Sequence, residues 1–197
     1  MRYLIVCGGK IDKEFGLNEI KTDGIDAIIA ADSGMDFLYE NGVMPDIIVG
    51  DFDSATTKAL EYFERKGQTE IHRLNPIKDD TDTEYAIRLA ISEGARSIVL
   101  LGATGSRIDH VLGNISLLGI GLESGTDISI IDTNNRIRMA DRPVTIEKSA
   151  QYGRFVSLIA VTDDNEVSLR GFKYPVTDYS FDRFTSLGIS NEIIDDH

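Results

Sequence analysis

Short apolar runs alternate with helix-length polar segments through the first 124 residues, and this alternation limits the folds open to the chain. The expected strands are residues 3–6, 26–30, 46–50, 69–74 and 97–101. The expected helices are residues 35–41, residues 55–66, one beginning at Asp82 and one following His110. Strands separated by helices of this length predict a mostly parallel, Rossmann-like α/β/α sandwich with helices on both faces of its sheet.

The pattern changes near residues 123–125, where the helical period disappears. The strand-like runs that follow are residues 128–131, 136–139, 144–147, 154–160, 166–169 and 184–186. Turn residues such as Asn134-Asn135 and Gly171 separate them. We therefore expect an α/β domain over residues 1–124 and a small antiparallel β-sandwich domain over residues 125–197. A domain of that size needs support from the first domain or from a second subunit.

Charge and cysteine content narrow the class of protein. The formal net charge is −13, which argues against a nucleic-acid surface or an anionic membrane as partner. Cys7 is the single cysteine, so the chain has no disulfide framework, and a cytoplasmic location fits. No apolar run approaches the ~20 residues of a membrane helix, and the N-terminus lacks the zones of a signal peptide.

Two aspartates follow the expected strand at residues 46–50. In an extended chain, residues i and i+2 point to one face, so Asp51 and Asp53 should project together with Phe52 turned away. Two close carboxylates repel each other unless a cation lies between them, and Mg²⁺ is the usual cation where phosphate is bound. The competing interpretation is that one of these aspartates, or Ser54, caps the next helix.

Other polar groups also follow the expected strands. Gly8-Gly9, Asp32, the cluster 78–82 and the glycine-rich turn 102–109 all fall at strand ends. Ligands of parallel sheets bind beyond the carboxyl ends of the strands, so these weak motifs predict one site with acids for a metal and donors for phosphate. Arg107 can grip a phosphate or pair with a nearby acid. His110 is either a general base or a hydrogen-bonded structural residue.

Several of these motifs together resemble the thiamin pyrophosphokinase family. The resemblance is carried by Ala31-Asp32-Ser33-Gly34, Pro45-Asp46, Val49-Gly50-Asp51-Phe52-Asp53-Ser54, Lys78-Asp79-x-Thr81-Asp82, Gly105-Ser106-Arg107-Ile108-Asp109-His110-x-x-x-Asn114 and Ser190-Asn191-Glu192. The motifs stand in the family's order and span nearly the whole chain. The resemblance implies an α/β catalytic domain followed by a β-sandwich domain, a homodimer, and transfer of diphosphate from ATP to thiamin, giving thiamin diphosphate and AMP.

The resemblance also implies roles for individual residues. An acidic site for Mg²⁺ and the triphosphate would comprise Asp32, Asp51, Asp53 and Asp82. The ATP side would comprise Gly9, Ser33, Gly34, Lys78, Thr81, Gly105, Arg107, Asp109, His110 and Asn114. Ser190 and Asn191 would contact thiamin, across the dimer interface.

Attack of an alcohol on phosphorus depends mainly on neutralising the phosphate charge and aligning the nucleophile, and little on covalent catalysis. Asp51, Asp53, Asp82 and Arg107 are therefore the expected catalytic residues, and either Asp53 or Asp82 would accept the hydroxyl proton. Two alternatives remain open from the residues alone. One is a metal-dependent nucleotide-sugar transferase, which also uses an Asp-x-Asp pair, and the other is a nucleotide or thiamin sensor without turnover.

Overall fold

The computed structural model describes residues 1–53, 56–75 and 80–196. The chain forms two compact units, Met1–Asp141 and Arg142–His197. Among the described residues, no helix has the length and apolar character that crossing a membrane requires.

The first unit is built on a seven-stranded sheet with the order β4-β3-β2-β1-β5-β6-β7. Its strands are β1 (Arg2–Val6), β2 (Ala27–Ala31), β3 (Ile47–Gly50), β4 (Glu70–Arg73), β5 (Ser97–Leu101), β6 (Asp127–Ile131) and β7 (Arg136–Arg138). All neighbouring pairs are parallel except β6 and β7, which pair antiparallel. The near-continuous apolar runs of the central strands suit a sheet that is covered on both faces.

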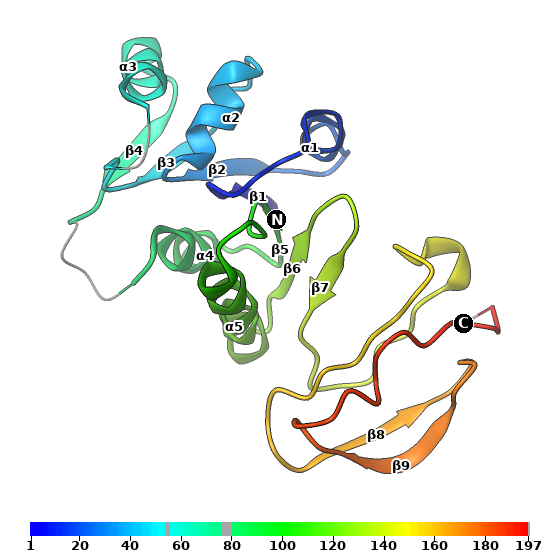
Figure 1. Ribbon diagram of the computed structural model, residues 1–197. Helices are drawn as coiled ribbons and strands as arrows, with labels where there is room; N and C mark the ends of the chain where they lie inside the picture. The colour runs from blue at the N-terminus through cyan, green and yellow to red at the C-terminus, as the bar shows by residue number, and fades with distance from the viewer. Residues whose placement is uncertain (54–55, 76–79, 197) are drawn as a thin grey trace. The chain divides into compact units, whose positions relative to one another are not determined.

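Helices cover both faces of this sheet, as the α/β/α prediction required (Figure 1). The helices are α1 (Lys13–Ile20), α2 (Gly34–Glu40), α3 (Thr57–Lys66), α4 (Asp82–Ser92) and α5 (Ile108–Ser124). One core includes Met35, Leu38 and Phe63 from α2 and α3. The opposite core includes Ile87 and Leu118 from α4 and α5. The first three helices thus lie on one face and the last two on the other.

The chain reverses its winding direction between β1 and β5. From β1 the sheet grows through β2, β3 and β4, and the chain then returns to add β5 and β6 on the other side of β1. In doubly wound sheets, this reversal opens a crevice beyond the carboxyl ends of the two central strands. The loops that follow β1, β2, β3, β5 and β6 all leave the sheet at that edge.

The first unit extends further along the chain than the change of periodicity predicted. Residues 128–131 were expected to begin the second domain, but β6 pairs in parallel with β5 over five residues. β7 then pairs with β6, so the division falls after Asp141 rather than near residue 124. The cause is that β6 is the last parallel strand of the sheet and is followed by β7 with no helix between them. A strand without a following helix looks, in sequence, like the start of an all-β region.

The second unit contains one two-stranded antiparallel sheet, formed by β8 (Asn165–Leu169) and β9 (Val176–Phe181). Isolated antiparallel bridges join Val156 to Asn191 and Phe172 to Ile193. The expected runs 144–147 and 184–186 form no strands, and a short 3₁₀ helix (Lys148–Ala150) follows the first of them. The second unit is therefore antiparallel, as expected, with less regular pairing than the alternation implied.

Candidate functional site

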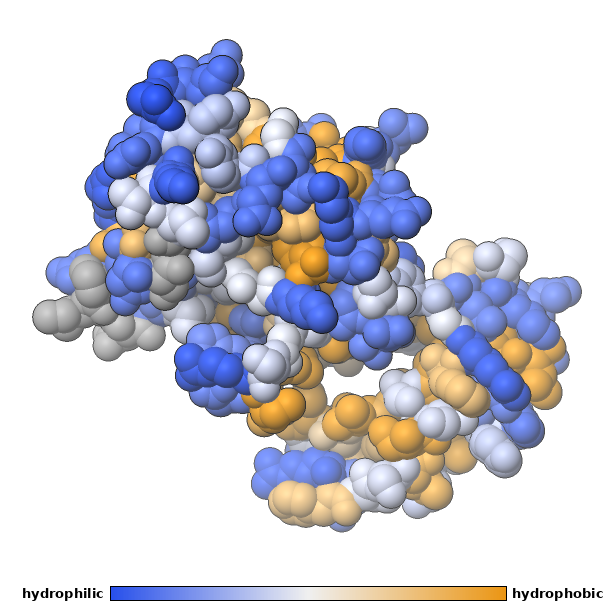
Figure 2. All heavy atoms as spheres, turned by 45° about the horizontal axis from the view of Figure 1, so that its top comes forward, coloured by the Kyte–Doolittle hydropathy of each residue, from blue (hydrophilic) through white to orange (hydrophobic). Residues whose placement is uncertain are grey.

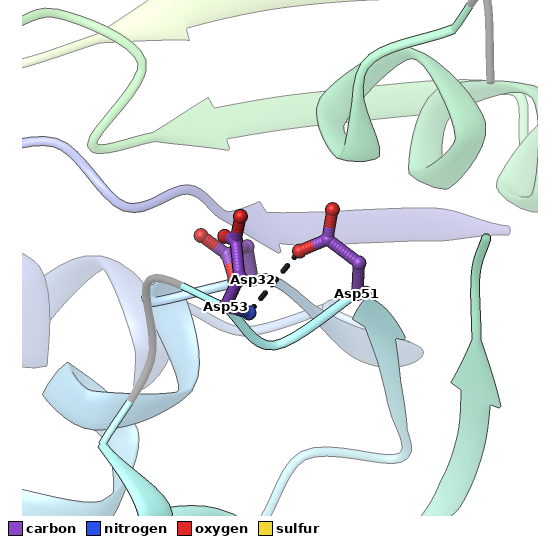
Figure 3. A group of neighbouring side chains, drawn as sticks. All are labelled: Asp32, Asp51 and Asp53. Carbon is purple, nitrogen blue, oxygen red and sulfur yellow. Dashed lines mark hydrogen bonds between the residues drawn. The ribbon is translucent and has the colours of Figure 1, made fainter. Parts of the chain in front are cut away.

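Three aspartates meet at the carboxyl edge of the parallel sheet (Figure 3). Asp32 follows β2, and Asp51 and Asp53 follow β3. Each offers one carboxylate oxygen, and these three oxygens lie within 4.8 Å of one another. The strands β2 and β3 are adjacent and parallel, which is why residues about twenty positions apart in the sequence converge here. The prediction that the sheet brings these acids together is confirmed.

Asp51 and Asp53 converge by a different local geometry from the one expected. Phe52 has a left-handed backbone, with φ 64°, so the chain turns between the two acids and does not continue as an extended strand. The backbone N–H of Asp53 donates to Asp51 Oδ1 at 3.2 Å, which closes the turn. The Phe52 ring lies against Gly50 and under the Arg73 guanidinium, 5.3 Å from the ring centroid. This packing holds a backbone conformation that costs energy for a residue with a side chain.

Asp32 is the most constrained of the three acids. Its backbone is also left-handed, with φ 47°, a conformation that aspartate tolerates better than most residues. Burial raises its pKa, and the charges of Asp82, Asp51 and Asp53 raise it further against a hydrogen bond from the Ser33 backbone. Its Oδ1 is buried and accepts no hydrogen bond from the described residues. A buried carboxylate oxygen beside two other carboxylates fits a hard divalent cation, which takes oxygen ligands.

Asp82 and Thr81 lie at the start of α4. Thr81 Oγ1 accepts a hydrogen bond from the Glu84 backbone at 3.2 Å, which confirms the predicted helix start. Asp82 is outside the group of three oxygens, although its charge acts on Asp32. Lys78, expected on the ATP side, lies outside the described residues.

Arg107 and Asp109 pair with each other at the start of α5. Arg107 Nη2 lies 2.7 Å from Asp109 Oδ2, and both side chains are more than 60% exposed. Hydrogen bonds from Arg107 and from the His110 backbone lower the pKa of Asp109. Of the two roles left open for Arg107, the structure shows pairing with an acid. An ion pair as exposed as this one contributes little to stability.

Three more of the expected ATP-side residues have structural roles, namely Asn114, Gly9 and Gly34. Asn114 Nδ2 donates to the Ala103 carbonyl at 2.7 Å and fixes the turn after β5. Gly9, in the turn after β1, is held against the turn after β5, because its backbone N–H donates to the Gly102 carbonyl at 2.9 Å. A Cβ on Gly34 would lie 1.9 Å from the Val6 carbonyl oxygen, so this glycine permits α2 to pack against β1. Ser33 precedes α2 without capping it through its side chain.

Asn191, expected to contact thiamin, is a buried internal residue of the second unit. Its amide accepts from the Tyr174 backbone N–H at 3.0 Å and donates to the Tyr174 carbonyl at 2.9 Å. Ser190 beside it is exposed and has a left-handed backbone, with φ 62°. Its N–H donates to Ser157 Oγ. These contacts make Asn191 an organiser of the second unit and leave the Ser190 side chain at the surface.

Glu192 joins two basic side chains in the same unit, and this predicts an acid-dependent loss of stability. Arg154 and Lys173 donate to it at 3.1 and 3.0 Å. The hydrogen bonds from Lys173 and Arg154 lower its pKa below the ordinary 4.5. A lowered folded-state pKa gives stability that is present above the unfolded-state pKa and lost as pH falls through the folded-state value.

We therefore expect Glu192→Gln to lower the melting temperature at pH 7. The difference from wild type should shrink as the pH falls below about 4.5, the ordinary pKa of the group. Thermal melts of both proteins between pH 3 and 7 measure it. A difference that stays constant over this range would contradict the pairing.

A pocket of about 480 Å³ lies beside the carboxyl edge of the parallel sheet, and it was not predicted from the sequence. It opens where β5 and β6 end, and Lys10, Thr104, Asp132, Thr133 and Asn134 contribute polar groups to its lining. The sequence signal for this pocket is the polar turn that follows the apolar run 128–131. Because that run was assigned to the second domain, its turn was not placed at the edge of the parallel sheet.

Sequence and structure comparisons agree on the relatives of this chain. Residues 21–130 match the family profile "Thiamin pyrophosphokinase, catalytic domain", and residues 143–197 match "Thiamin pyrophosphokinase, vitamin B1 binding domain". The thiamine pyrophosphokinase of Bacillus subtilis is 36% identical over 168 residues, which cover 84% of this chain and 78% of the relative.

Solved structures give the same result. A crystal structure of the Bacillus subtilis enzyme aligns with a TM-score of 0.87 at 33% identity, covering 100% of this chain and 91% of the other. That of the Geobacillus thermodenitrificans enzyme aligns with a TM-score of 0.81 at 31% identity, covering 100% and 90%. The two profiles leave a gap at residues 131–142, which contains the division between the units. This chain belongs to the thiamin pyrophosphokinase family.

Proposed function

We propose that this protein transfers a diphosphate group from ATP to the hydroxyl of thiamin, with Mg²⁺ held by Asp32, Asp51 and Asp53. Family membership supports the reaction. The single observation that carries the metal assignment is the convergence of three carboxylate oxygens within 4.8 Å of one another. One of the three carboxylates, that of Asp32, has a buried Oδ1 that accepts no hydrogen bond from the described residues. When bound there, Mg²⁺ would neutralise the charge of the triphosphate and of the transition state.

The protein's own residues would then align the reactants. Arg107 would exchange its exposed pair with Asp109 for a phosphate oxygen, which suits the planar, bidentate guanidinium. Asp53 and Asp82 remain the two candidates for accepting the proton of the thiamin hydroxyl. Asp82 is the better candidate, because it lies outside the group of three oxygens that we assign to the cation and still close enough to act on Asp32.

One assay tests the reaction and separates it from the alternatives. Incubation of the protein with ATP, Mg²⁺ and thiamin should yield AMP and thiamin diphosphate in equal amounts. A nucleotide-sugar transferase would release a nucleoside diphosphate and a glycoside, and a sensor would show ligand-dependent melting without AMP. The comparisons favour neither alternative, since both profiles and the Bacillus subtilis relative are thiamin pyrophosphokinases. Absence of AMP with intact, folded protein would reject the proposal.

We further propose that the protein works as a homodimer in the cytoplasm. Exposed apolar side chains support an interface. On α5, Ile108 and Leu112 are 67% and 59% exposed and lie four residues apart, hence on one face of the helix. In the second unit, Phe155, Ile159 and Phe184 are exposed, and Figure 2 shows hydrophobic patches on the surface.

We expect light scattering after gel filtration to give a mass twice the 21.7 kDa of the chain. Replacing Leu112 by aspartate should shift the protein toward the monomer if α5 forms part of the interface, because a charge would be buried there. Replacing the exposed Thr22 by aspartate is the control. A monomeric mass for the wild type at micromolar concentration would contradict the dimer.

A further inference from the structure

We propose that Asp36 is a positioning residue for the cation site, because it anchors the loop that carries Asp51 and Asp53 to helix α2. The proposal rests on the proposed function for the identity of the cation. Asp36 lies outside the group of three convergent carboxylate oxygens. Its own carboxylate bonds to Thr56, the residue at which the loop ends and α3 begins. Asp36 therefore acts on the site through the loop and not as a ligand.

The Asp36 carboxylate holds Thr56 through both its backbone and its side chain. The backbone N–H of Thr56 is shared between Oδ1 at 3.3 Å and Oδ2 at 3.2 Å, and the hydroxyl of Thr56 donates to Oδ1. Hydrogen bonds to an ionised acceptor are roughly twice as strong as bonds between neutral groups. Because Thr56 makes no capping bond to α3 with its own side chain, the bonds to Asp36 tie the start of α3 to α2.

Helix α2 gives this anchor a firm base. Met35 and Leu38 are completely buried, and Gly34 lets the first turn of α2 pack directly on β1. The same helix begins just after Asp32, the third acid of the site. One rigid element therefore carries Asp32 at its start and Asp36 about one turn later, so the anchor ties the loop to the element that also positions Asp32.

Aromatic packing keeps α3 beside α2 (Figure 1). The Tyr39 ring of α2 meets the Tyr62 and Phe63 rings of α3 edge-on, with centroid distances of 5.2 and 6.4 Å. Residues three apart share one face of a helix, so Asp36 and Tyr39 both lie on the face of α2 that meets α3. The polar contact at the start of α3 and the aromatic contact further along it together fix this pair of helices.

Two forces act to open the turn that carries the acids. The left-handed backbone of Phe52 costs energy, and the charges of Asp51 and Asp53 repel each other at close range. Closing the loop at Thr56 opposes both, because the turn cannot open from that end without breaking the bonds to Asp36. Ligands that are held in place before an ion arrives lose less conformational entropy on binding. Supporting contacts around metal ligands raise affinity in this way.

The competing interpretation is that Asp36 only caps α3. A carboxylate at a helix N-terminus stabilises the helix through its dipole and its free N–H groups. On either interpretation, Asp36→Ala should lower the melting temperature. Only the positioning role predicts that the same change also loosens Asp53 and weakens cation binding, so these two quantities decide between the interpretations.

Three variants separate the anchor from the charge of Asp36. Asp36→Ala removes both. Asp36→Asn removes the charge but keeps an oxygen that accepts from the Thr56 N–H and an amide that donates to the Thr56 hydroxyl. Asp26→Ala is the control, because it also removes a charge and a backbone hydrogen bond. That bond comes from the Arg2 N–H at 2.7 Å, where β2 begins at the other end of the sheet.

Amide exchange followed by NMR without metal, and a Mn²⁺ titration followed by electron paramagnetic resonance, test the role of Asp36. Asp36→Ala should speed exchange at Asp53 as well as at Thr56, and it should weaken Mn²⁺ binding by about tenfold. Asp36→Asn should recover the slow exchange and most of the affinity. Asp26→Ala should match the wild type in both measurements.

Unchanged exchange at Asp53 in Asp36→Ala would overturn the positioning role and leave the kinase standing. An Asp36→Asn variant as weak as Asp36→Ala would do the same, since the charge and not the anchor would then matter. If the wild type bound no Mn²⁺ while Asp36→Ala still loosened Asp53, the cation assignment of the proposed function would be refuted, and the anchoring of the loop by Asp36 would stand.

Discussion

Asp53→Asn is expected to abolish diphosphate transfer while the protein remains folded. Asp53 supplies one of the three convergent oxygens, and an amide is a weaker ligand for a hard cation than a carboxylate. A metal ion contributes several kcal/mol to stabilising the transition state, and about 1.4 kcal/mol corresponds to tenfold in rate. We therefore expect kcat to fall by about 10³-fold.

The folded stability of the same variant, unlike its turnover, should not fall. Removing one of several like charges relieves repulsion at the site, so the melting temperature without metal should stay the same or rise. The stabilisation that Mg²⁺ gives to the wild type should be lost, since only the metal-binding form benefits from the ion. Asp23→Asn makes the same charge change at an exposed position outside the site. Turnover near that of the wild type in Asp53→Asn would refute the metal assignment.

Gly34→Ala should strongly destabilise the first unit, although it adds only one methyl group. Its Cβ would lie 1.9 Å from the Val6 carbonyl oxygen and 2.6 Å from the Val6 carbonyl carbon, both of them backbone atoms of a central strand. Neither atom can move without disturbing the sheet. We expect a loss of about 3 kcal/mol, which corresponds to roughly a 10 °C fall in melting temperature for a chain of this size.

Gly113→Ala is the matched control for this effect. Gly113 lies inside α5, and a Cβ there meets no atom within 4 Å. Alanine is favoured over glycine inside a helix by about 0.5–1 kcal/mol, so this variant should be slightly more stable than the wild type. If Gly34→Ala melted no lower than Gly113→Ala, the close packing of α2 on β1 would be refuted. If it melted lower yet kept its affinity for ATP, Gly34 would be a packing residue and not an ATP ligand.

The elements of the first unit could be predicted because their local signals agree. α4 begins at Asp82, as expected, with Thr81 as its cap, and α3 ends at Lys66, as expected, followed by Gly67 in a left-handed conformation. No helix was among the expected elements before residue 35, and residues 13–20 form the short helix α1 with Asp12 as its cap. That helix depends on packing of Phe15 and Ile20 against the core more than on its own sequence pattern.

The convergence of three aspartates was predictable from the sequence, and the local geometry that brings them together was not. The rule that ligands bind at the carboxyl ends of parallel strands was sufficient to group Asp32 with Asp51 and Asp53. The turn at Phe52 could not be predicted, because left-handed backbone at a bulky residue contradicts local preference and is held by tertiary packing. The pocket was missed for a topological reason. No local signal distinguishes the last parallel strand of a sheet from an antiparallel strand, so Asp132 was not placed beside Thr104.

At the proposed cation site, the left-handed torsion at Phe52 should affect ion selectivity. Because a turn outside β3 sets the separation of the two carboxylates, their spacing can adjust by small torsional changes without moving the sheet. A pair fixed by the pleat of a strand would lack this freedom. We expect the enzyme to accept Mn²⁺ in place of Mg²⁺ with modest loss, since both are hard octahedral ions of different radius.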